Sequence, residues 1–237
     1  MHNQRFLIVN ADDFGQSPGV NRGIAAAHER GILTSASMMV RWPHAAEAAR
    51  YALDHPALSV GLHLDFGEWT FRDGEWSCLY SVVDEHDSSA VEREIASQLA
   101  AFRNLMGRSP THIDSHQHAH RKEPARSIVC AIASGLAILI RDLDPRVRYC
   151  GNFYGQEGDG TPWPEGITVA ALAGILRGLE PGFTELGCHP ADEADLDTMY
   201  RTERLQELAT LCDPLARATL EELGVELCSF YRVVSGS

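Results

Sequence analysis

Short apolar runs that end in aspartate or histidine alternate along this chain with helix-like stretches. The first run, Phe6–Val9, has no polar interruption, which is typical of a strand covered on both faces. Ser17 and Pro18 then form a helix start, and Gly31 is a helix stop directly after Arg30. Repeated alternation of this kind predicts an α/β fold with a mainly parallel sheet and right-handed crossovers.

The remaining elements continue the alternation. Strands are predicted over Leu33–Val40, Leu58–Leu64, Thr111 onward, Leu136–Ile140, Val147–Cys150, Thr184–Cys188 and Glu226–Val234. Helices are predicted over Pro43–Asp54, from a capping box at Ser89 and Glu92 to Gly107, over Ala170–Leu179, and over Thr202–Leu223 with a break near Pro214. Two long connections, 67–87 and 151–166, are rich in glycine and aromatic residues and are typical of lids or binding loops.

Composition narrows the class of protein. Of the 237 residues, 44% are hydrophobic and 22% are charged, as in an ordinary soluble globular protein. The 20 Lys and Arg against 33 Asp and Glu give a net charge of −13, which disfavours nucleic acid or an anionic membrane as partner. Six scattered cysteines without C-x-x-C spacing indicate reduced thiols and a cytoplasmic protein. Met1–Arg5 lead straight into a strand, so we expect no signal peptide, and no apolar run approaches the ~20 residues that span a bilayer.

A pair of adjacent carboxylates, Asp12 and Asp13, directly follows the first predicted strand. In parallel α/β proteins, ligands bind and catalysis occurs at the carboxyl ends of the strands. Successive residues of an extended chain point opposite ways, so one carboxylate can face a metal and the other a substrate or its water. The alternative is that the pair only forms an Asx turn or caps a helix.

Four of the eleven histidines fall within nine residues of the fourth predicted strand. If this segment is extended, its alternating ionisable residues all lie on one face: His112, Asp114, His116, His118 and His120. If the segment is helical, only His112, His116 and His120 lie on the same face. Five ionisable groups are more than one metal uses, and they seldom cluster in a core without partners. The alternative is a polar strand end or loop.

Two further histidines occupy predicted strand ends. His63 is the one polar side chain in Gly61–Leu64, and considered alone it would be a hydrogen-bonded core residue. His189 precedes Pro190, which holds the histidine out of a helical conformation. It could donate a proton to a leaving group or simply lie exposed in a loop. Asp, His, His and His on four strand ends together predict a metal-dependent hydrolase.

The motifs N-A-D-D-F-G, G-L-H-L, T-H-I-D-S-H-Q-H-A-H and C-H-P occur in this order along the chain. Together they resemble the YdjC-like (ChbG/HpnK) carbohydrate deacetylase family, from Phe6 to about Pro190 and on to Arg232 if the last predicted strand is included. The resemblance implies a distorted, barrel-like (β/α) fold, with residues 1–237 forming a single catalytic domain. It implies removal of an acetyl group from an N-acetylated sugar, such as a chito-oligosaccharide or an N-acetylglucosaminyl conjugate. It also implies one divalent metal held by an Asp-His-His set.

The resemblance implies roles for five residues of this sequence. Asp13, His63 and His116 would hold the metal, whose identity the mixed nitrogen and oxygen ligands leave open among Zn, Mg, Co, Ni and Mn. The metal would polarise the acetyl carbonyl, and Asp12 would be the general base that accepts a proton as the metal-bound water attacks. His189 would be the general acid that protonates the departing amine.

Other residues have less definite roles. His112 is the first histidine of the family's H-x-x-x-H element, and we interpret it as a support for the metal ligands. Asp65-Phe66 stands where the family often has threonine or asparagine, which leaves the identity of the sugar open. His118 and His120 have no assigned role, and Arg141, at the end of a predicted strand, is interpreted as facing the substrate.

Two other functions explain part of the pattern. A metal phosphoesterase prefers two metals or a basic phosphate clamp, and no Gly-rich phosphate loop or arginine cluster flanks these motifs. A non-catalytic sugar- or metal-binding protein would explain the histidines and the aromatic loops, whose rings either stack on sugar faces or simply pack the loops. It gives no reason for Asp12 and Asp13 together with His189. The expected partner is an N-acetylated sugar, and a homodimer is left open.

Overall fold

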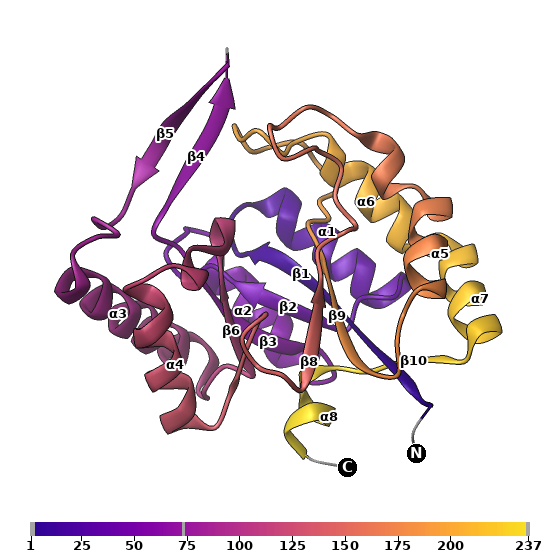
Figure 1. Cartoon of the computed structure of the whole chain (residues 1–237), viewed down its shortest axis with the longest axis horizontal. Helices are drawn as coiled ribbons and strands as arrows, with labels where there is room; N and C mark the ends of the chain where they lie inside the picture. Colours follow the sequence, from indigo (N-terminus) through magenta and orange to yellow (C-terminus); the bar gives the residue numbers. More distant parts are fainter. Residues whose placement is uncertain (1–2, 73, 236–237) are drawn as a thin grey trace.

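The computed structural model describes residues 3–72 and 74–235, and its largest element is an eight-stranded sheet (Figure 1). Its strands are β1 (Arg5–Phe14), β2 (Ser35–Met38), β3 (Ser59–Leu64), β6 (His112–Ser115), β7 (Leu139–Ile140), β8 (Val147–Cys150), β9 (Gly182–Cys188) and β10 (Val225–Leu227). Their order is β7-β6-β3-β2-β1-β9-β8, with β10 paired to the beginning of β1. All pairings in this sheet are parallel, so the carboxyl ends of the strands meet at one edge.

Helices surround the outside of the curled sheet, and β7 and β8 lie at its two ends, which makes an open half-barrel (Figure 1). The α-helices are α1 (Pro18–Arg30), α2 (Ala45–Asp54), α3 (Ser88–Met106), α4 (Ala125–Leu136), α5 (Val169–Arg177), α6 (Glu203–Leu211), α7 (Pro214–Leu223) and α8 (Phe230–Ser235). Two 3₁₀ helices are η1 (His116–Arg121) and η2 (Pro164–Ile167). The predicted barrel-like α/β fold with mainly parallel strands is confirmed. None of the described helices has the length and apolarity needed to cross a membrane.

Capping residues set where the helices begin. Ser17 Oγ accepts a backbone N–H of the first turn at 3.1 Å and Pro18 opens the helix, so α1 has its predicted start. The predicted capping box at Ser89 is wrong, because Asp87 is the N-cap of α3 and accepts a backbone N–H at 3.0 Å. The predicted break near Pro214 is confirmed, since this proline begins α7.

β1 runs through the centre of the core. Leu7, Ile8 and Val9 are fully buried, as expected of an apolar run covered on both faces. Ile24 of α1 and Phe102 of α3 are buried in the main core from the helical layer. This packing fixes the strands in place, so polar side chains at their carboxyl ends are held on a rigid frame.

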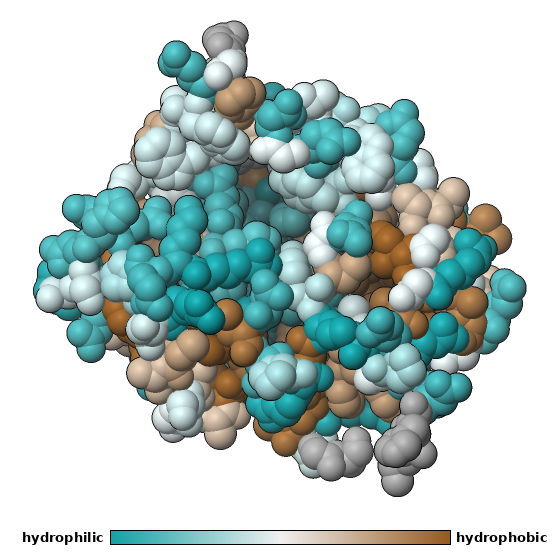
Figure 2. All heavy atoms as spheres, in the orientation of Figure 1, coloured by the Kyte–Doolittle hydropathy of each residue, from teal (hydrophilic) through white to brown (hydrophobic). Residues whose placement is uncertain are grey.

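The predicted long loop 67–87 contains an antiparallel hairpin of β4 (Gly67–Arg72) and β5 (Glu75–Ser81), which projects from the body of the molecule (Figure 1). Its buried residues are polar, Glu68 and Thr70, while Trp69 between them is 46% exposed. The reversed alternation explains why a search for apolar strand faces missed the hairpin. Figure 2 shows a hollow with a hydrophilic floor between this hairpin and the side of the molecule that carries α5 and α6.

Two further predictions differ from the structure. The helix α4 was not predicted, and residue Leu136, assigned to a strand, ends it. The predicted strand Glu226–Val234 stops at Leu227 and is followed by α8. Aromatic and β-branched residues favour a strand there by propensity, but a helical turn buries Phe230 and Val233 on the same side. Tertiary packing therefore overrides local preference at this end of the chain.

Candidate functional site

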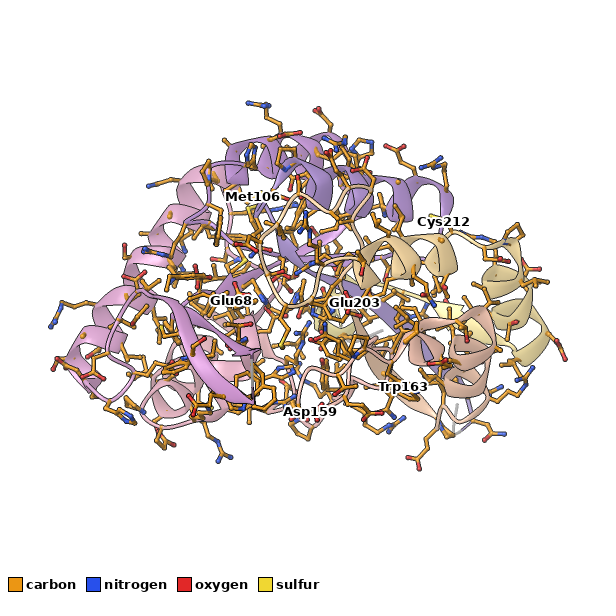
Figure 3. All side chains as sticks on the ribbon, turned by 90° about the horizontal axis from the view of Figure 1, so that it is seen from above. Glu68, Met106, Asp159, Trp163, Glu203 and Cys212 are labelled. Carbon is orange, nitrogen blue, oxygen red and sulfur yellow. The ribbon has the colours of Figure 1, made fainter. Side chains whose placement is uncertain are left out.

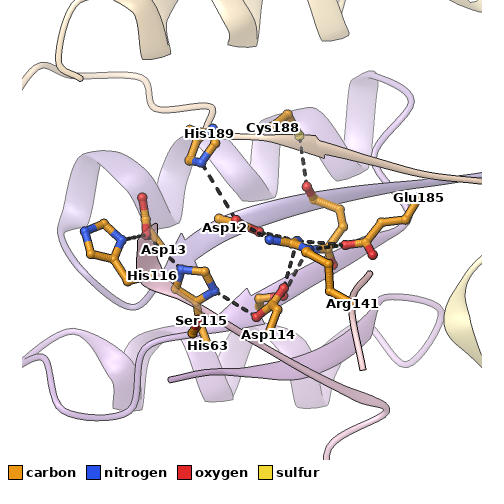
Figure 4. A network of polar contacts seen from close by, with 12 residues as sticks. Asp12, Asp13, His63, Asp114, Ser115, His116, Arg141, Glu185, Cys188 and His189 are labelled. Atoms are coloured by element: carbon orange, nitrogen blue, oxygen red, sulfur yellow. Dashed lines mark hydrogen bonds and ion pairs between the residues drawn. The ribbon is translucent and has the colours of Figure 1, made fainter. Parts of the chain in front are cut away.

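The five residues with a predicted catalytic or metal-binding role line a single cavity of about 290 Å³. Asp12 and Asp13 lie near the end of β1, His63 lies on β3, His116 follows β6 and His189 follows β9. Parallel pairing brings these strand ends to the same edge of the sheet, and Figure 4 shows the side chains gathered there. The structure thus brings together residues that are up to 177 positions apart in the sequence (189 − 12).

The Asp12-Asp13 pair does not have the simple alternation expected of an extended strand. Asp13 has a left-handed backbone, with φ of 66°, and the pairing of β1 with β2 shifts register between Ala11 and Phe14. This irregularity turns both carboxylates toward the cavity instead of placing them on opposite faces. A left-handed non-glycine residue costs about 1–3 kcal/mol, and such strain concentrates at functional sites.

Asp13, His63 and His116 form a candidate metal centre. Asp13 Oδ1 lies 3.4 Å from His63 Nε2 and 3.2 Å from His116 Nδ1, and the three ligand atoms lie within 4.8 Å of one another. Arg204 Nη2 donates to the other oxygen, Oδ2, at 2.7 Å. The guanidinium therefore orients the carboxylate so that Oδ1 faces both imidazoles.

The surroundings of these side chains fit a divalent ion. His63 Nδ1 lies 2.8 Å from Asp114 Oδ1, which leaves Nε2 for the ligand position, an arrangement common behind metal-binding histidines. His116 Nε2 lies 3.7 Å from Glu68 Oε2, so this ring also has a carboxylate on its far side. Two nitrogens and one oxygen beside an open cavity are typical of a catalytic site that keeps a position free for water or substrate.

The electrostatics of the centre favour positive charge at the two imidazoles. Burial lowers the pKa of His63, but Asp114 and Asp12 outweigh it and raise the pKa to about 10. Burial likewise lowers the pKa of His116, but the hydrogen bond to Asp13 and the nearby carboxylate of Glu68 outweigh it and raise the pKa to about 9. A place that holds protons this strongly also attracts a metal cation, which must displace those protons to bind.

A second cluster of potential ligands, Asp12, His63 and Asp114, lies next to the first. Arg141 already neutralises it, because Nη1 and Nη2 lie 2.6 Å from the two oxygens of Asp12, and Nη2 lies 2.7 Å from Asp114 Oδ2. Nη2 also lies 2.7 Å from Glu185 Oε1. A guanidinium that serves three carboxylates occupies the position of a cation here, so the Asp13 cluster is the better candidate for a metal.

The interpretation that Arg141 faces the substrate is wrong. Its side chain is fully buried behind Asp12 and is not among the residues that line the cavity (Figure 4). Burial raises the pKa of Asp12, but the charges of Arg141 and His63, together with the hydrogen bonds from Arg141, outweigh it, and the net pKa lies below its ordinary value. Asp12 is therefore ionised at neutral pH and is fixed in orientation by two parallel hydrogen bonds.

His189 lies across the cavity from the metal candidates. Its Nε2 lies 3.8 Å from Asp12 Oδ2, and its backbone N–H donates to Glu207. The rings of Tyr154 and Tyr200 lie edge-on at 5.5 and 5.4 Å from the imidazole. These contacts hold the ring at the cavity with its side chain 21% exposed, so it can reach a bound molecule.

The histidine-rich segment is neither wholly extended nor one regular helix. β6 ends at Ser115, and η1 follows with left-handed residues at Gln117 and His118. His118 lines the cavity, whereas His120 is buried between Ser115 Oγ and the Arg141 carbonyl. Neither predicted alternative holds, because the strand ends at Ser115 and the left-handed residues Gln117 and His118 interrupt the helical segment that follows.

His112 lies behind the centre. Its Nε2 lies 2.9 Å from Ser37 Oγ, and that hydroxyl donates to Asp114 Oδ2 at 2.7 Å. Its ring stacks on Phe230 with centroids 3.8 Å apart, and burial lowers its pKa to about 4, so the ring is neutral. His112 thus contacts the candidate ligand His63 through Ser37 and Asp114, which fits a supporting role.

Several site residues had no assigned role in the sequence. Glu185 gave a recognisable signal, since it is a lone acid in an otherwise buried strand. Arg204 gave none, because it lies 191 residues from the aspartate that it holds. Seen from above, Glu68 of β4 and Glu203 at the start of α6 lie on either side of the molecule's centre (Figure 3). The hairpin and α6 therefore contribute the cavity residues Glu68 and Arg204, although neither segment contains a recognisable sequence motif.

Fold and site define an α/β protein with a half-barrel sheet and a candidate metal centre at its carboxyl edge. The chain belongs to the YdjC-like family, whose sequence model matches residues 6–222. It is 34% identical to the carbohydrate deacetylase of Geobacillus stearothermophilus, over 95% of this chain and 97% of that protein. It is 31% identical to the chitooligosaccharide deacetylase of Serratia marcescens, over 96% and 98%. The family resemblance inferred from the motifs is confirmed.

Solved structures share the fold. A protein from Enterococcus faecalis, described as a candidate cellobiose-phosphate cleavage protein, aligns with a TM-score of 0.76 and 24% identity, over 97% of this chain and 99% of that chain. A family 4 carbohydrate esterase from Streptomyces lividans, in complex with acetate, aligns with a TM-score of 0.58 and 13% identity, over 96% and 92%. At these identities the likeness concerns the fold alone.

Proposed function

We propose that this chain is a metal-dependent carbohydrate deacetylase that removes the acetyl group from an N-acetylated sugar, such as a chito-oligosaccharide or an N-acetylglucosaminyl conjugate. The observation that carries the proposal is the convergence of Asp12 and His189 with the Asp13, His63 and His116 cluster on one cavity. The names of the relatives from Geobacillus stearothermophilus and Serratia marcescens support the same reaction. The six free cysteines are consistent with the cytoplasmic setting that we propose for this single catalytic domain.

Asp13, His63 and His116 would hold one divalent metal ion, with Arg204 fixing the carboxylate. When bound, such an ion polarises a carbonyl group and lowers the pKa of a water molecule. Asp12 would then act as the general base, since Arg141 keeps it ionised and aimed at the cavity. The attacking water loses its proton to this carboxylate as the bond to the acetyl carbon forms.

His189 would act as the general acid. An amine is a poor leaving group until it is protonated, so collapse of the tetrahedral adduct requires a proton at the departing nitrogen. His189 Nε2 lies 3.8 Å from Asp12 Oδ2, which allows both side chains to reach the same small substrate group. Acid and base groups of this kind each contribute about 10²–10⁴-fold to the rate.

Phosphoester hydrolysis is a weaker alternative. It requires cations that hold the phosphate, and within the described residues Arg204 is the arginine that lines this cavity. That guanidinium is already paired with Asp13 at 2.7 Å. Its charge is therefore largely neutralised, and the cavity offers little to bind a phosphate dianion.

The test is acetate release from short N-acetylglucosamine oligomers by chelated protein, with Zn, Mg, Co, Ni or Mn added back singly. We expect release that depends on one or more of these metals. Phosphate release from phosphomonoesters under the same conditions separates the alternative. Protein that binds a metal but releases neither product would overturn the proposal in favour of a binding function.

A further inference from the structure

Asp65 directly follows β3 and has no role in the mechanism above. It is 2% exposed and is not among the residues that line the cavity of the candidate site. A carboxylate in this place is therefore not a direct ligand for a sugar held in that cavity. A buried carboxylate requires partners, and the partners of Asp65 indicate what it does.

The carboxylate of Asp65 joins the β4–β5 hairpin to the loop between β2 and α2. Its Oδ1 accepts the Gly67 backbone N–H at 3.2 Å and the Tyr80 hydroxyl at 3.0 Å, one from each strand of the hairpin. Its Oδ2 accepts the Trp42 indole N–H at 3.2 Å. Burial and the charge of Asp65 raise the pKa of Tyr80, so this hydroxyl remains a donor. All three groups are donors, and a carboxylate can accept from each of them.

The backbone of Asp65 is held from another direction by α3. Gln98 Oε1 accepts the Asp65 N–H at 2.9 Å, and Gln98 Nε2 donates to the Asp65 carbonyl at 2.7 Å. Gln98 is itself 2% exposed, so water competes little for these two bonds. The base of the hairpin is therefore anchored to the sheet, to the loop after β2 and to α3.

The anchored hairpin in turn contacts the segment that carries His116. Gln117 Nε2 donates to the Trp69 carbonyl at 2.7 Å, and Gln117 Oε1 accepts the Trp69 N–H at 3.0 Å. Glu68 Oε2 lies 3.7 Å from His116 Nε2. Because Glu68 and Trp69 closely follow Asp65 in the chain, a displacement of the hairpin base would move both contacts together.

His116 depends on such contacts more than the other two candidate ligands do. Asp13 and His63 belong to strands of the central sheet, and their side chains are 1% exposed. His116 begins η1, whose next two residues have left-handed backbones, and its side chain is 13% exposed. A ligand on irregular backbone requires support from its neighbours, and the hairpin supplies it.

We propose that Asp65 is a positioning residue for the candidate metal centre, which anchors the β4–β5 hairpin so that the hairpin holds the His116 segment through Glu68 and Trp69. This inference rests on the metal centre of the proposed function. Groups that orient metal ligands from outside typically change metal affinity about 10–100-fold when they are removed. Asp65 acts one step further out, through the hairpin.

A carboxamide cannot replace the carboxylate of Asp65 without conflict. If the NH2 group of an asparagine took the place of Oδ2, it would face the Trp42 N–H. If it took the place of Oδ1, it would face the Gly67 N–H and the Tyr80 hydroxyl. Two donors therefore oppose each other whichever way the amide lies, and the hairpin base loses its anchor.

The experiment measures the dissociation constants of Zn²⁺ and Mn²⁺ by calorimetry, with chelated parent protein and Asp65→Asn. We expect the substitution to raise the dissociation constant of the bound metal about tenfold or more. The matched control is Asp84→Asn, because Asp84 is exposed and accepts the His86 backbone N–H at 3.0 Å, a bond that a carboxamide oxygen also accepts. The control should leave metal affinity unchanged.

Gln117→Ala tests whether the effect passes through the hairpin. It removes the two bonds to Trp69 and leaves the surroundings of Asp65 intact. The double variant should lose less affinity than the product of the two single losses, because both changes cut the same connection. Fully multiplicative losses would overturn the route through the hairpin.

Urea unfolding of the same proteins distinguishes positioning from a purely structural role. A structural role lowers the free energy of unfolding and leaves the metal affinity of the folded protein unchanged, which would overturn the proposal. If Asp65→Asn does not fold, Tyr80→Phe removes one of the three bonds to its carboxylate and should still weaken metal binding. Unchanged affinity in both Tyr80→Phe and Gln117→Ala would equally overturn it.

Acetate release from N-acetylglucosamine oligomers, measured on the same proteins, separates this inference from the proposed function. If the parent binds metal without releasing acetate, and Asp65→Asn weakens that binding, the positioning role stands and the deacetylase function fails. If acetate release depends on metal while Asp65→Asn and Asp84→Asn bind metal equally well, the function stands and the positioning role is wrong. A parent that binds neither metal overturns the positioning role.

Discussion

Arg204 donates to Asp13 Oδ2 at 2.7 Å and leaves Asp13 Oδ1 facing the two imidazoles of the candidate metal centre. Both side chains are almost fully buried, at 4% and 1% exposure. Burial raises the pKa of Asp13, but Arg204 and the hydrogen bonds from the imidazoles outweigh it and hold the pKa well below its ordinary value. The candidate metal centre and the stability of the fold therefore depend on the same ion pair.

Removing this arginine should destabilise the metal-free protein. Breaking a buried ion pair by deleting one partner typically costs about 3–5 kcal/mol, because the other charge is left uncompensated. We expect Arg204→Met to lower the free energy of unfolding in urea by that amount. The control is Arg22→Met, whose pair with Asp192 at 2.8 Å is exposed and screened by solvent, so its loss should change stability little. Equal losses in the two variants would contradict the role assigned to Arg204.

The catalytic and metal-binding roles can be separated by metal content. Asp12→Asn should retain the metal and lose about 10²–10⁴-fold in kcat, because it removes the base and keeps the cluster around Asp13. His63→Ala and His116→Ala should lose metal affinity instead. The control His44→Ala, at a half-buried histidine outside the cavity, should change neither quantity. Loss of metal in Asp12→Asn would exchange the two aspartate roles, and full occupancy in either histidine variant would remove that histidine from the ligand set.

Much of the fold followed from local pattern. Apolar runs such as Phe6–Val9 predicted buried parallel strands, and the proline at 18 with the serine before it predicted the start of α1. These signals are local, because they depend on covering both faces of a strand and on capping one helix end. The buried residues of the hairpin, Glu68 and Thr70, are polar, so the usual apolar alternation was missing.

The site was predictable only in part, because some of its residues are brought together by long-range contacts that leave no local pattern. Asp13, His63 and His116 stand in motifs at strand ends, and parallel pairing places such ends together. Arg204 and Arg141 act through ion pairs over long separations, 191 residues in the case of Arg204 and Asp13. The local sequence around an arginine does not indicate which distant carboxylate it pairs with in the folded protein.

Metal affinity should rise steeply with pH. In the metal-free protein the pKa of His63 is raised to about 10 and that of His116 to about 9, so both rings are protonated at neutral pH. A metal ligand must be deprotonated, so binding releases up to two protons below pH 9, and the dissociation constant should fall by up to about a hundredfold per pH unit. Calorimetry at pH 6–9 in buffers of different ionisation enthalpy measures the protons released. Affinity independent of pH would mean that these imidazoles are not the ligands.

Glu185 should make the fold less stable as the pH rises. Burial raises its pKa to about 7, only partly opposed by Arg141, against 4.5 for an ordinary glutamate. The folded state therefore binds this proton more tightly than the unfolded chain, and the resulting stabilisation is complete below pH 4.5 and lost as the pH rises through 7. Its size is at most about 3 kcal/mol.

Glu185→Gln keeps an oxygen that can accept the hydrogen bond from Arg141 Nε and cannot ionise. We expect the variant to flatten the pH dependence of unfolding between pH 5 and 8 and to equal or exceed the parent in stability at pH 8. Urea unfolding of the metal-free proteins at several pH values measures the pH dependence of unfolding and the stability at pH 8. Glu180→Gln is the control, since Glu180 is 76% exposed and its substitution should leave the profile unchanged. If Glu185→Gln instead loses stability at pH 8 and keeps the parent's slope, Glu185 is ionised in the native state, and the raised pKa is wrong.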